Sequence, residues 1–334
     1  MAALPNTRLT LADLLKYMDP QGGVAPVVEL LAQRNESMTD PVFMPGNLPT
    51  GHQFSVRTAL PTAYLRDYNE GVLPSKSAAA QQTEGMCIVE AWSEVDAAEA
   101  KLNGNEAAFR AQEDKAFIQS MEQQFVQQMF YGDVRTDPKA VNGLITRIGT
   151  ASHPQFIDCG GTGSDNMSIV LAQWGDDLFG TYPKGSEGGL QANNHNRQII
   201  QFSDGKRMLA LVSQFIWNFG FVQRDYRTTV RIGNIDVSDL RARTGTQLIT
   251  AATSIVYAMH DALYKLPSGQ GAVFYMNRTA HSALSKIAMD KSQNVVLMRE
   301  GLSQFGKPYR WLDFAGTPVR CVDRLLNTEA RVTG

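Results

Sequence analysis

The sequence predicts an α+β fold, and three observations support this prediction. A long helical pattern occupies residues 105–132, and strand patterns dominate residues 156–232. Two extended arms, at residues 52–65 and 84–96, enclose a polar turn. Of the 334 residues, 43% are hydrophobic and 19% are charged, which is a globular composition. The length suffices for about two domains.

The first part of the chain predicts an arm and a long hairpin. Residues 8–34 carry two short helical patterns with too little apolar bulk to fold alone, so we expect an arm that packs on another surface. A joint rich in Pro and Gly at residues 41–51 leads into the hairpin, whose tip is expected near Asn69-Glu70-Gly71. An isolated two-stranded hairpin is marginal in water, so a hairpin of this length must lie on another surface.

Residues 105–132 predict one amphipathic helix of about 40 Å at 1.5 Å per residue. Asn105 is a suitable N-cap and Gly132 a suitable stop. The large apolar side chains recur at steps of eight and then four, which places them on one helix face. They are Phe109, Phe117, Met121, Phe125 and Met129.

The β-rich body follows. The pattern SIVLAQW predicts a buried strand, and Asp204-Gly205 predicts a hairpin turn between RQIIQF and KRMLALVSQFIWNFGF. The aromatic residues from Phe215 to Phe221 recur at a period of two, which indicates the inward face of a strand rather than a surface for stacking bases. In YRTTVRI the alternation predicts one solvent-facing side, which includes Arg231.

The last third alternates helix and strand. Residues 244–266 predict a helix, residues 271–277 a strand and residues 278–292 a short helix. The pattern WLDFAGTPVRCVD predicts a closing hairpin.

The stretch DCGGTGSDNMS at residues 158–168 invites three interpretations. A phosphate loop requires a lysine after the glycines, and a dinucleotide loop requires a following helix; neither is present. The nonapeptide pattern of calcium-binding β-helices fits residues 160–168, but such sites need tandem copies and the next nine residues do not repeat it. The sequence favours a tight turn before a strand, in which Gly takes positive φ and Asp or Asn bonds the local backbone.

No pattern predicts an enzyme, a metal or a cofactor. The net charge is −2 and no basic block is present, which argues against sequence-specific binding of nucleic acid. Cys87, Cys159 and Cys321 form no CxxC pair, so a zinc or redox site has no local support. The five histidines form no HExxH or HxH pattern, so we expect structural or surface histidines. The carboxylates of Glu94-Val95-Asp96 and Asp176-Asp177 are expected at strand ends or turns. No apolar run is long enough to predict a membrane span.

The order of these elements resembles the major capsid proteins of tailed double-stranded DNA bacteriophages. The stretch that leads out of the long helix, FYGDVRTDPKAVNGLITRI, resembles the family's exit from its spine helix through Gly132-Asp133, Pro138 and Gly143-Leu144. GAVFYMNRTAHSALSKI and TPVRCVDRLL resemble later parts of that fold. Four further stretches are similar to a subgroup that includes short-tailed phages: GNLPTGHQFSVRTALPTAYLRDYNEGVLPSKS, GTGSDNMSIVLAQWG, YPKGSEGGLQ and LLNTEARV.

The resemblance implies the Hong Kong 97-like capsid fold, and with it a division of the chain. The expected parts are an N-terminal arm (1–45), an extended hairpin with flanking strands (46–100), a peripheral domain with the spine helix (101–140 plus 308–334) and an axial domain (141–307). The hairpin would lie across a neighbouring subunit, with assembly contacts at its tip. The expected contact residues are Arg66, Asp67, Glu70 and Lys76. No motif identifies a crosslinking partner for Lys76.

The resemblance also implies function and partners. The chain would assemble into hexamers and pentamers of an icosahedral shell that encloses double-stranded DNA without sequence recognition. Only about 45 residues precede the hairpin, which implies a separate scaffolding protein; a portal protein and a decoration protein are further expected partners. The chain would reside in the virion after assembly in the host cytoplasm. Two alternatives stay open: an encapsulin-like cellular compartment, and a calcium- or nucleotide-dependent enzyme.

Overall fold

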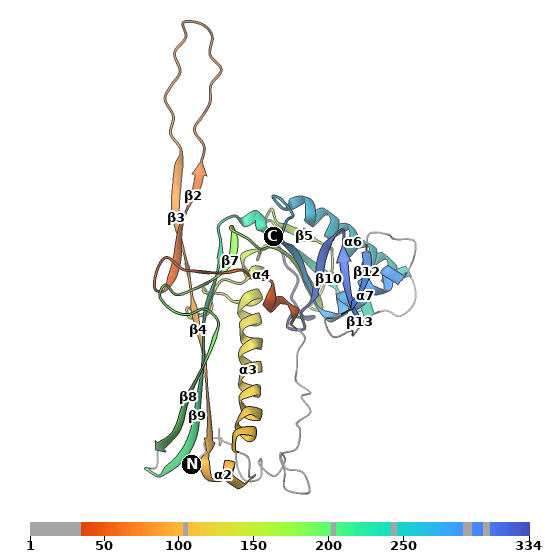
Figure 1. The fold of residues 1–334 in the computed structure, drawn as a ribbon. Coiled ribbons are helices and arrows are strands. Elements are labelled where there is room, and N and C mark those ends of the chain that lie inside the picture. The colour runs from red at the N-terminus through yellow and green to blue at the C-terminus, as the bar shows by residue number, and fades with distance from the viewer. Residues whose placement is uncertain (1–34, 103–105, 202–204, 242–245, 290–295, 303–307) are drawn as a thin grey trace. The chain divides into compact units, whose positions relative to one another are not determined.

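The computed structural model describes residues 35–102, 106–201, 205–241, 246–289, 296–302 and 308–334 (Figure 1). The described residues form two compact units. Residues 88–127 and 189–218 make up the smaller unit, and residues 35–87, 128–188 and 219–334 the larger one. Residues 1–34 of the predicted N-terminal arm (1–45) lie outside the described residues, as do Asn105 and Asp204. The α+β prediction is confirmed, and the predicted four-part division stays a prediction.

The larger unit is built on a seven-stranded sheet in the order β12-β13-β14-β11-β6-β10-β5 (Figure 1). Its strands are β5 (Phe156–Asp158), β6 (Asn166–Gln173), β10 (Thr229–Asp236), β11 (Ala272–Met276), β12 (Val296–Leu302), β13 (Pro308–Phe314) and β14 (Thr317–Cys321). Strands β13 and β14 form the predicted closing hairpin, whose turn holds Ala315 and Gly316 at positive φ. Both therefore lie in the same sheet as β6, β10 and β11.

Three helices build the core of this unit together with the sheet. They are α5 (Val237–Arg241), α6 (Thr246–Lys265) and α7 (Arg278–Met289). Apolar side chains of α6 and α7, such as Met259 and Leu284, are fully buried in one cluster with Leu171, Val230 and Phe274 of the strands. The two predicted helices and the strand between them are confirmed. Among the helices that the structure describes, none is long and apolar enough to cross a membrane.

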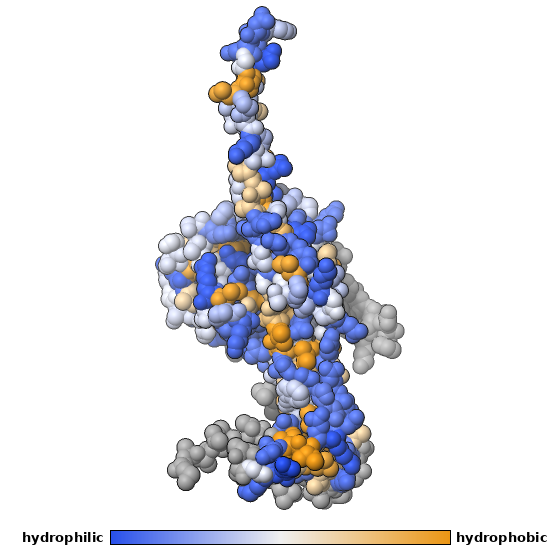
Figure 2. Space-filling model, turned by 90° about the vertical axis from the view of Figure 1, so that its left-hand side faces the viewer, coloured by the Kyte–Doolittle hydropathy of each residue, from blue (hydrophilic) through white to orange (hydrophobic). Residues whose placement is uncertain are grey.

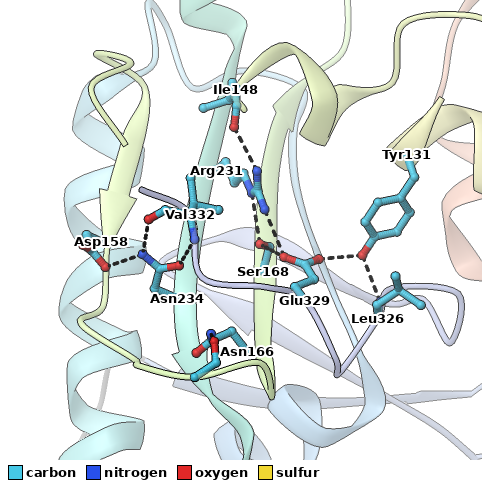
Figure 3. Close-up of polar contacts among 11 residues, drawn as sticks. Tyr131, Ile148, Asp158, Asn166, Ser168, Arg231, Asn234, Leu326, Glu329 and Val332 are labelled. Carbon is cyan, nitrogen blue, oxygen red and sulfur yellow. Dashed lines mark hydrogen bonds and ion pairs between the residues drawn. The ribbon is translucent and has the colours of Figure 1, made fainter. Parts of the chain in front are cut away.

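The expected solvent-facing side of YRTTVRI is wrong. Strand β10 is buried on both faces, and Arg231 is only 6% exposed. The strand lies between β6 and β5, and the Arg231 guanidinium forms an ion pair with Glu329 at 3.0 Å (Figure 3). An ionised side chain can be buried when a partner of opposite charge compensates it. The partner lies 98 residues further along the chain, where a local alternation pattern could not reveal it.

The glycine-rich stretch forms the predicted turn before a strand. Gly160 and Gly163 have φ of 81° and 99°, in the left-handed region that favours glycine. The Asp158 carboxylate accepts a hydrogen bond from the Gly160 N–H, and the Asn166 side chain donates to the Gly163 carbonyl. Strand β6 starts at Asn166 and is buried over most of its length.

The segment between the long helix and α4 (Leu144–Arg147) is closed by two glycines. The Gly143 N–H donates to the Gly132 carbonyl at 2.9 Å. A Cβ on Gly132 would lie 2.2 Å from the Val141 carbonyl oxygen, and one on Gly143 would lie 2.5 Å from that of Phe130. Only glycine fits this close approach of two backbones, which explains the spacing of the two residues.

A five-stranded sheet in the order β1-β7-β9-β4, with β8 also paired to β9, contributes strands to both units. Its strands are β1 (Phe43–Pro45), β4 (Cys87–Asp96), β7 (Leu178–Tyr182), β8 (Leu190–Gln201) and β9 (Arg207–Gln223). Two 3-10 turns complete the larger unit: η2 (Glu36–Thr39) and η3 (Tyr226–Thr228). The β8–β9 register from Gln201 to Arg207 confirms the predicted hairpin.

The smaller unit packs the predicted long helix on strands β4, β8 and β9. The helix is α3 (Glu106–Tyr131), preceded by α2 (Ala97–Leu102), which Asp96 caps through the Ala98 N–H. Phe125 is fully buried and stacks on Trp217 with ring centroids 4.4 Å apart, and Phe117 stacks on Phe215 at 6.4 Å. The predicted helix and the predicted inward-facing aromatic run are both confirmed, and they pack on each other.

Candidate assembly surface

The hairpin pairs strands β2 (Gly51–Ala59) and β3 (Ala78–Gly85) and belongs to the larger unit (Figure 1). The first arm agrees with the prediction, but the second does not. Residues 87–96 form β4, which is a strand of the five-stranded sheet, and the partner of β2 is β3 instead. The reason is compositional: β3 reads AAAQQTEG, is almost wholly exposed and has no apolar face that a pattern could reveal.

The base of the hairpin is fixed to the unit by apolar packing. Phe54 of β2 is buried against Phe179 of β7 and Val222 of β9, with Met44 and Val56 beside them. The Asn47 side chain adds two hydrogen bonds to the Gln53 backbone, at 2.6 and 2.7 Å. The direction in which the hairpin leaves the unit is therefore set by packed and bonded residues.

A largely buried ion pair holds the second arm. Glu84 of β3 accepts from Arg147 at 2.5 Å, and both side chains are at most 15% exposed. Arg147 also donates to the Phe221 carbonyl, and the Asn142 side chain lies 3.4 Å from Glu84. Because this pair shields both charges from water, loss of either partner would leave an uncompensated charge at the hairpin base.

Among the described residues, no strand pairs with the outer half of the hairpin, residues 60–77, and no surface buries it. Every residue of this segment is exposed. One cross-hairpin contact joins its two arms: the Ser75 hydroxyl donates to the Thr62 carbonyl at 2.9 Å. Apart from this bond and the turn at the tip, the described residues give the segment little support within its own unit.

The tip is a turn held by two of the four predicted contact residues. The Asp67 carboxylate accepts from the Tyr68 N–H at 2.8 Å, and the Glu70 carboxylate accepts from the Asp67 N–H at 3.1 Å. Asn69 adopts the left-handed conformation at φ 64°, where the tip was predicted. Asp67 and Glu70 thus shape the turn as well as exposing charge.

The other two predicted residues, Arg66 and Lys76, are exposed on the two arms. The structure brings Asp67 and Glu70 together in one turn but shows no bond from Arg66 or Lys76 to either of them within the described part of the chain.

The sequence reasoning missed the apolar residues of the outer half. Leu65 is fully exposed, Tyr68 is 95% exposed and Leu73 is 74% exposed, with Leu60, Tyr64 and Val72 also at the surface. Figure 2 shows apolar surface part-way along this segment. The signal was present in the sequence as LRDY and GVLP, where large apolar residues flank a polar turn. Contiguous exposed apolar residues are typical of protein interaction surfaces.

Several histidines pack against aromatic rings. His52 is buried at the hairpin base, edge-on to Phe179 at 5.4 Å; its burial, followed by the nearby Arg224, lowers its pKa. His195 stacks on Trp92 at 5.6 Å. Burial raises the pKa of Cys87 and Cys159 to about 12, so both thiols stay protonated. No group of three potential ligands from His, Cys, Asp and Glu is placed to hold a metal ion among the described residues.

Comparison with known families decides the class of protein. The sequence model of the family described as major capsid protein GP7 matches residues 19–333. The chain belongs to this family of major capsid proteins. A comparison with curated protein sequences found no match.

The solved structures agree with the family. The capsid protein is similar to a chain in the near-atomic structure of bacteriophage Epsilon15, with 30% sequence identity, full coverage of both chains and a TM-score of 0.74. It shares its fold with the capsid of bacteriophage JBD30 at 12% identity, with 89% of this chain and 92% of that chain covered and a TM-score of 0.50. The fold is therefore the Hong Kong 97-like capsid fold, and the resemblance seen in the sequence is confirmed.

A likeness to an encapsulin also exists. The encapsulin SrpI of Synechococcus elongatus PCC 7942 matches with 10% identity and a TM-score of 0.41, over 66% of this chain and 95% of that chain. A similarity at this level carries no argument for a cellular compartment. The capsid protein is a structural subunit of a bacteriophage shell.

Proposed function

We propose that the hairpin is the element through which this capsid protein joins its neighbours into hexamers and pentamers. The single observation that supports this is the outer half, residues 60–77, which is exposed along its whole length and carries apolar side chains. Burial of such side chains against a second copy would supply the free energy that the segment lacks within its own unit. Repetition of this contact around a closed, symmetric shell multiplies its effect.

Arg66 and Lys76 are the cleanest probes of this contact, because Asp67 and Glu70 also shape the tip turn. We expect Arg66→Glu with Lys76→Glu to block shell assembly while the free subunit keeps its thermal stability. The matched control is Lys115→Glu with Lys139→Glu, which makes the same change of charge at exposed positions outside the hairpin. Electron microscopy and sedimentation count the shells. If the control blocks assembly equally, net charge and not the hairpin is the cause.

Deletion of residues 66–76 is the coarser test. The core of the larger unit contains no residue of this segment, so we expect the subunit to fold and assembly to stop. A loss of thermal stability as large as that caused by a core substitution would contradict the proposal.

We also propose the binding partners of the capsid protein and the place where it assembles. The resemblance supports a shell around double-stranded DNA, together with a scaffolding protein, a portal protein and a decoration protein, assembled in the bacterial cytoplasm. The net charge of −2 suits a shell that encloses DNA without gripping it, since each neutralised phosphate would add salt-dependent affinity. Mass spectrometry of purified particles tests these partners directly.

A further inference from the structure

A buried carboxylate near the C-terminal end of the chain joins three separate elements (Figure 3). Glu329 accepts from the Tyr131 hydroxyl at 2.6 Å through one oxygen. Its other oxygen accepts from the Ser168 hydroxyl at 2.5 Å and from Arg231 at 3.0 Å. Tyr131 is the last residue of α3, Ser168 lies on β6 and Arg231 on β10.

The site around this carboxylate is built from buried groups. Ser168, Arg231 and Glu329 are each at most 9% exposed. Arg231 also donates to the Ile148 carbonyl and to the Ser168 hydroxyl, both at 3.0 Å. Burial, followed by the nearby Glu329, raises the pKa of Tyr131, so its hydroxyl stays a donor. Three donors in a dry, preformed arrangement are what a carboxylate ligand requires.

The segment that carries Glu329 is attached through polar groups. We call residues 326–333 the C-terminal strap. It exchanges two backbone hydrogen bonds with Asn166, through Glu329. The Asn234 side chain then donates to the Val332 carbonyl and accepts from the Val332 N–H, at 3.0 and 2.8 Å (Figure 3).

The strap contributes almost nothing apolar to the fold. Glu329 is its only buried residue, and Leu326 is 44% exposed. The large apolar cluster of the seven-stranded sheet contains no strap residue. Segments with few buried apolar contacts open locally, at a lower free energy than the whole domain. The sheet can therefore stay folded when the strap leaves it.

We infer that Tyr131, Ser168 and Arg231 form a carboxylate-binding site that the chain fills with its own Glu329, and that the C-terminal strap leaves and re-enters this site as a unit. Departure of the strap would leave the buried Arg231 without its counter-charge. Because this is costly, the strap stays bound most of the time. The ligand that fits the empty site is a carboxylate on an extended peptide. We propose that the occupant is the C-terminal strap of this protein, either the subunit's own or that of another copy.

Hydrogen exchange on the full-length free subunit tests the local opening. In Glu329→Gln we expect the amides of the strap to exchange at least about 10-fold faster, and to be accelerated far more than the amides of β11, which no bond joins to Glu329. The matched control is Asp323→Asn, which removes a carboxylate six residues earlier from the ion pair with Arg278, whose side chain is 68% exposed, and should leave the strap unchanged. Equal acceleration across the sheet, or none in the strap, would overturn the inference.

A milder variant covers the case in which Glu329→Gln does not fold. Tyr131→Phe removes the hydroxyl that donates to Glu329 and accepts from the Leu326 N–H, and it leaves the ion pair intact. We expect strap amides to exchange about 10- to 100-fold faster, as the loss of two such bonds implies. Unchanged exchange in this variant would show that Tyr131 does not hold the strap.

Binding in trans tests the carboxylate site itself. A fluorescent peptide of residues 324–334 is titrated into full-length Glu329→Gln, whose own strap is released. We expect the natural peptide to bind at least about 10-fold more tightly than the same peptide with Gln at position 329, a difference of about 1.4 kcal/mol. The wild-type subunit should bind it more weakly, because its own strap competes. Equal affinity of the two peptides, or no binding of either, would refute the inference.

Discussion

Phe125 allows the packing of the long helix to be tested with a worked magnitude. Its side chain is fully buried in the smaller unit and stacks on Trp217 with ring planes 3° apart. Phe125→Ala removes the ring and leaves a cavity between α3 and β9, which costs about 3 to 5 kcal/mol. Loss of the aromatic pair accounts for about 0.5 to 1.5 kcal/mol of this total.

Chemical denaturation of the free subunit measures this loss. Phe117→Ala is the matched control on the same helix, because Phe117 is only half-buried and its ring lies 6.4 Å from that of Phe215. We expect the control to cost about 1 to 2 kcal/mol, in proportion to its smaller buried area. A double-mutant cycle with Trp217→Ala isolates the pair. Equal losses for Phe125→Ala and Phe117→Ala would refute the assignment of Phe125 to the core.

Two further predictions follow from close packing and from buried charge. Gly132→Ala should destabilise the subunit by about 2 to 3 kcal/mol, because its Cβ would overlap the Val141 carbonyl. The control Gly85→Ala has open space around the new Cβ and should be near neutral in the same denaturation assay. Burial, followed by the carboxylates of Asp114 and Glu99, raises the pKa of Glu113. The folded chain therefore gains a proton more readily than the unfolded chain, and acidification from pH 7 through the raised pKa removes a destabilising charge. We expect Glu113→Gln to stabilise the subunit at pH 7 and to lose this advantage near pH 4, as thermal melts over this range would show.

Elements whose signal is local were predictable from the sequence. The spacing of apolar residues in α3 and the Asp-Gly turn of the β8–β9 hairpin depend on neighbours a few positions away. The glycine-rich stretch before β6 belongs to the same class, since its turn bonds join Asp158 to Gly160 and Asn166 to Gly163.

The errors arose where a distant residue decides the environment. Arg231 reads as a surface charge, and only Glu329 makes its burial tolerable. The sequence of β3 has too few apolar residues to be recognised as a strand. It forms a strand because its backbone hydrogen-bonds to that of β2. The charged residues at the hairpin tip were predicted from the family resemblance. The exposed Leu65 and Leu73 beside them were missed, because their exposure is a property of the folded chain.

The two halves of the hairpin differ in stiffness. The inner half is a hydrogen-bonded strand pair whose base packs against Phe179 and Val222, so it resists bending. Beyond Ala59 and Ala78 the ladder stops, and the Ser75–Thr62 bond joins the two arms below the tip turn. The outer half can therefore curve or twist without breaking a ladder. A closed shell made of many copies of one chain presents its subunits with unequal local curvature. Under the proposed role of the hairpin, a stiff base and a flexible end would let the same sequence reach its neighbour in each setting.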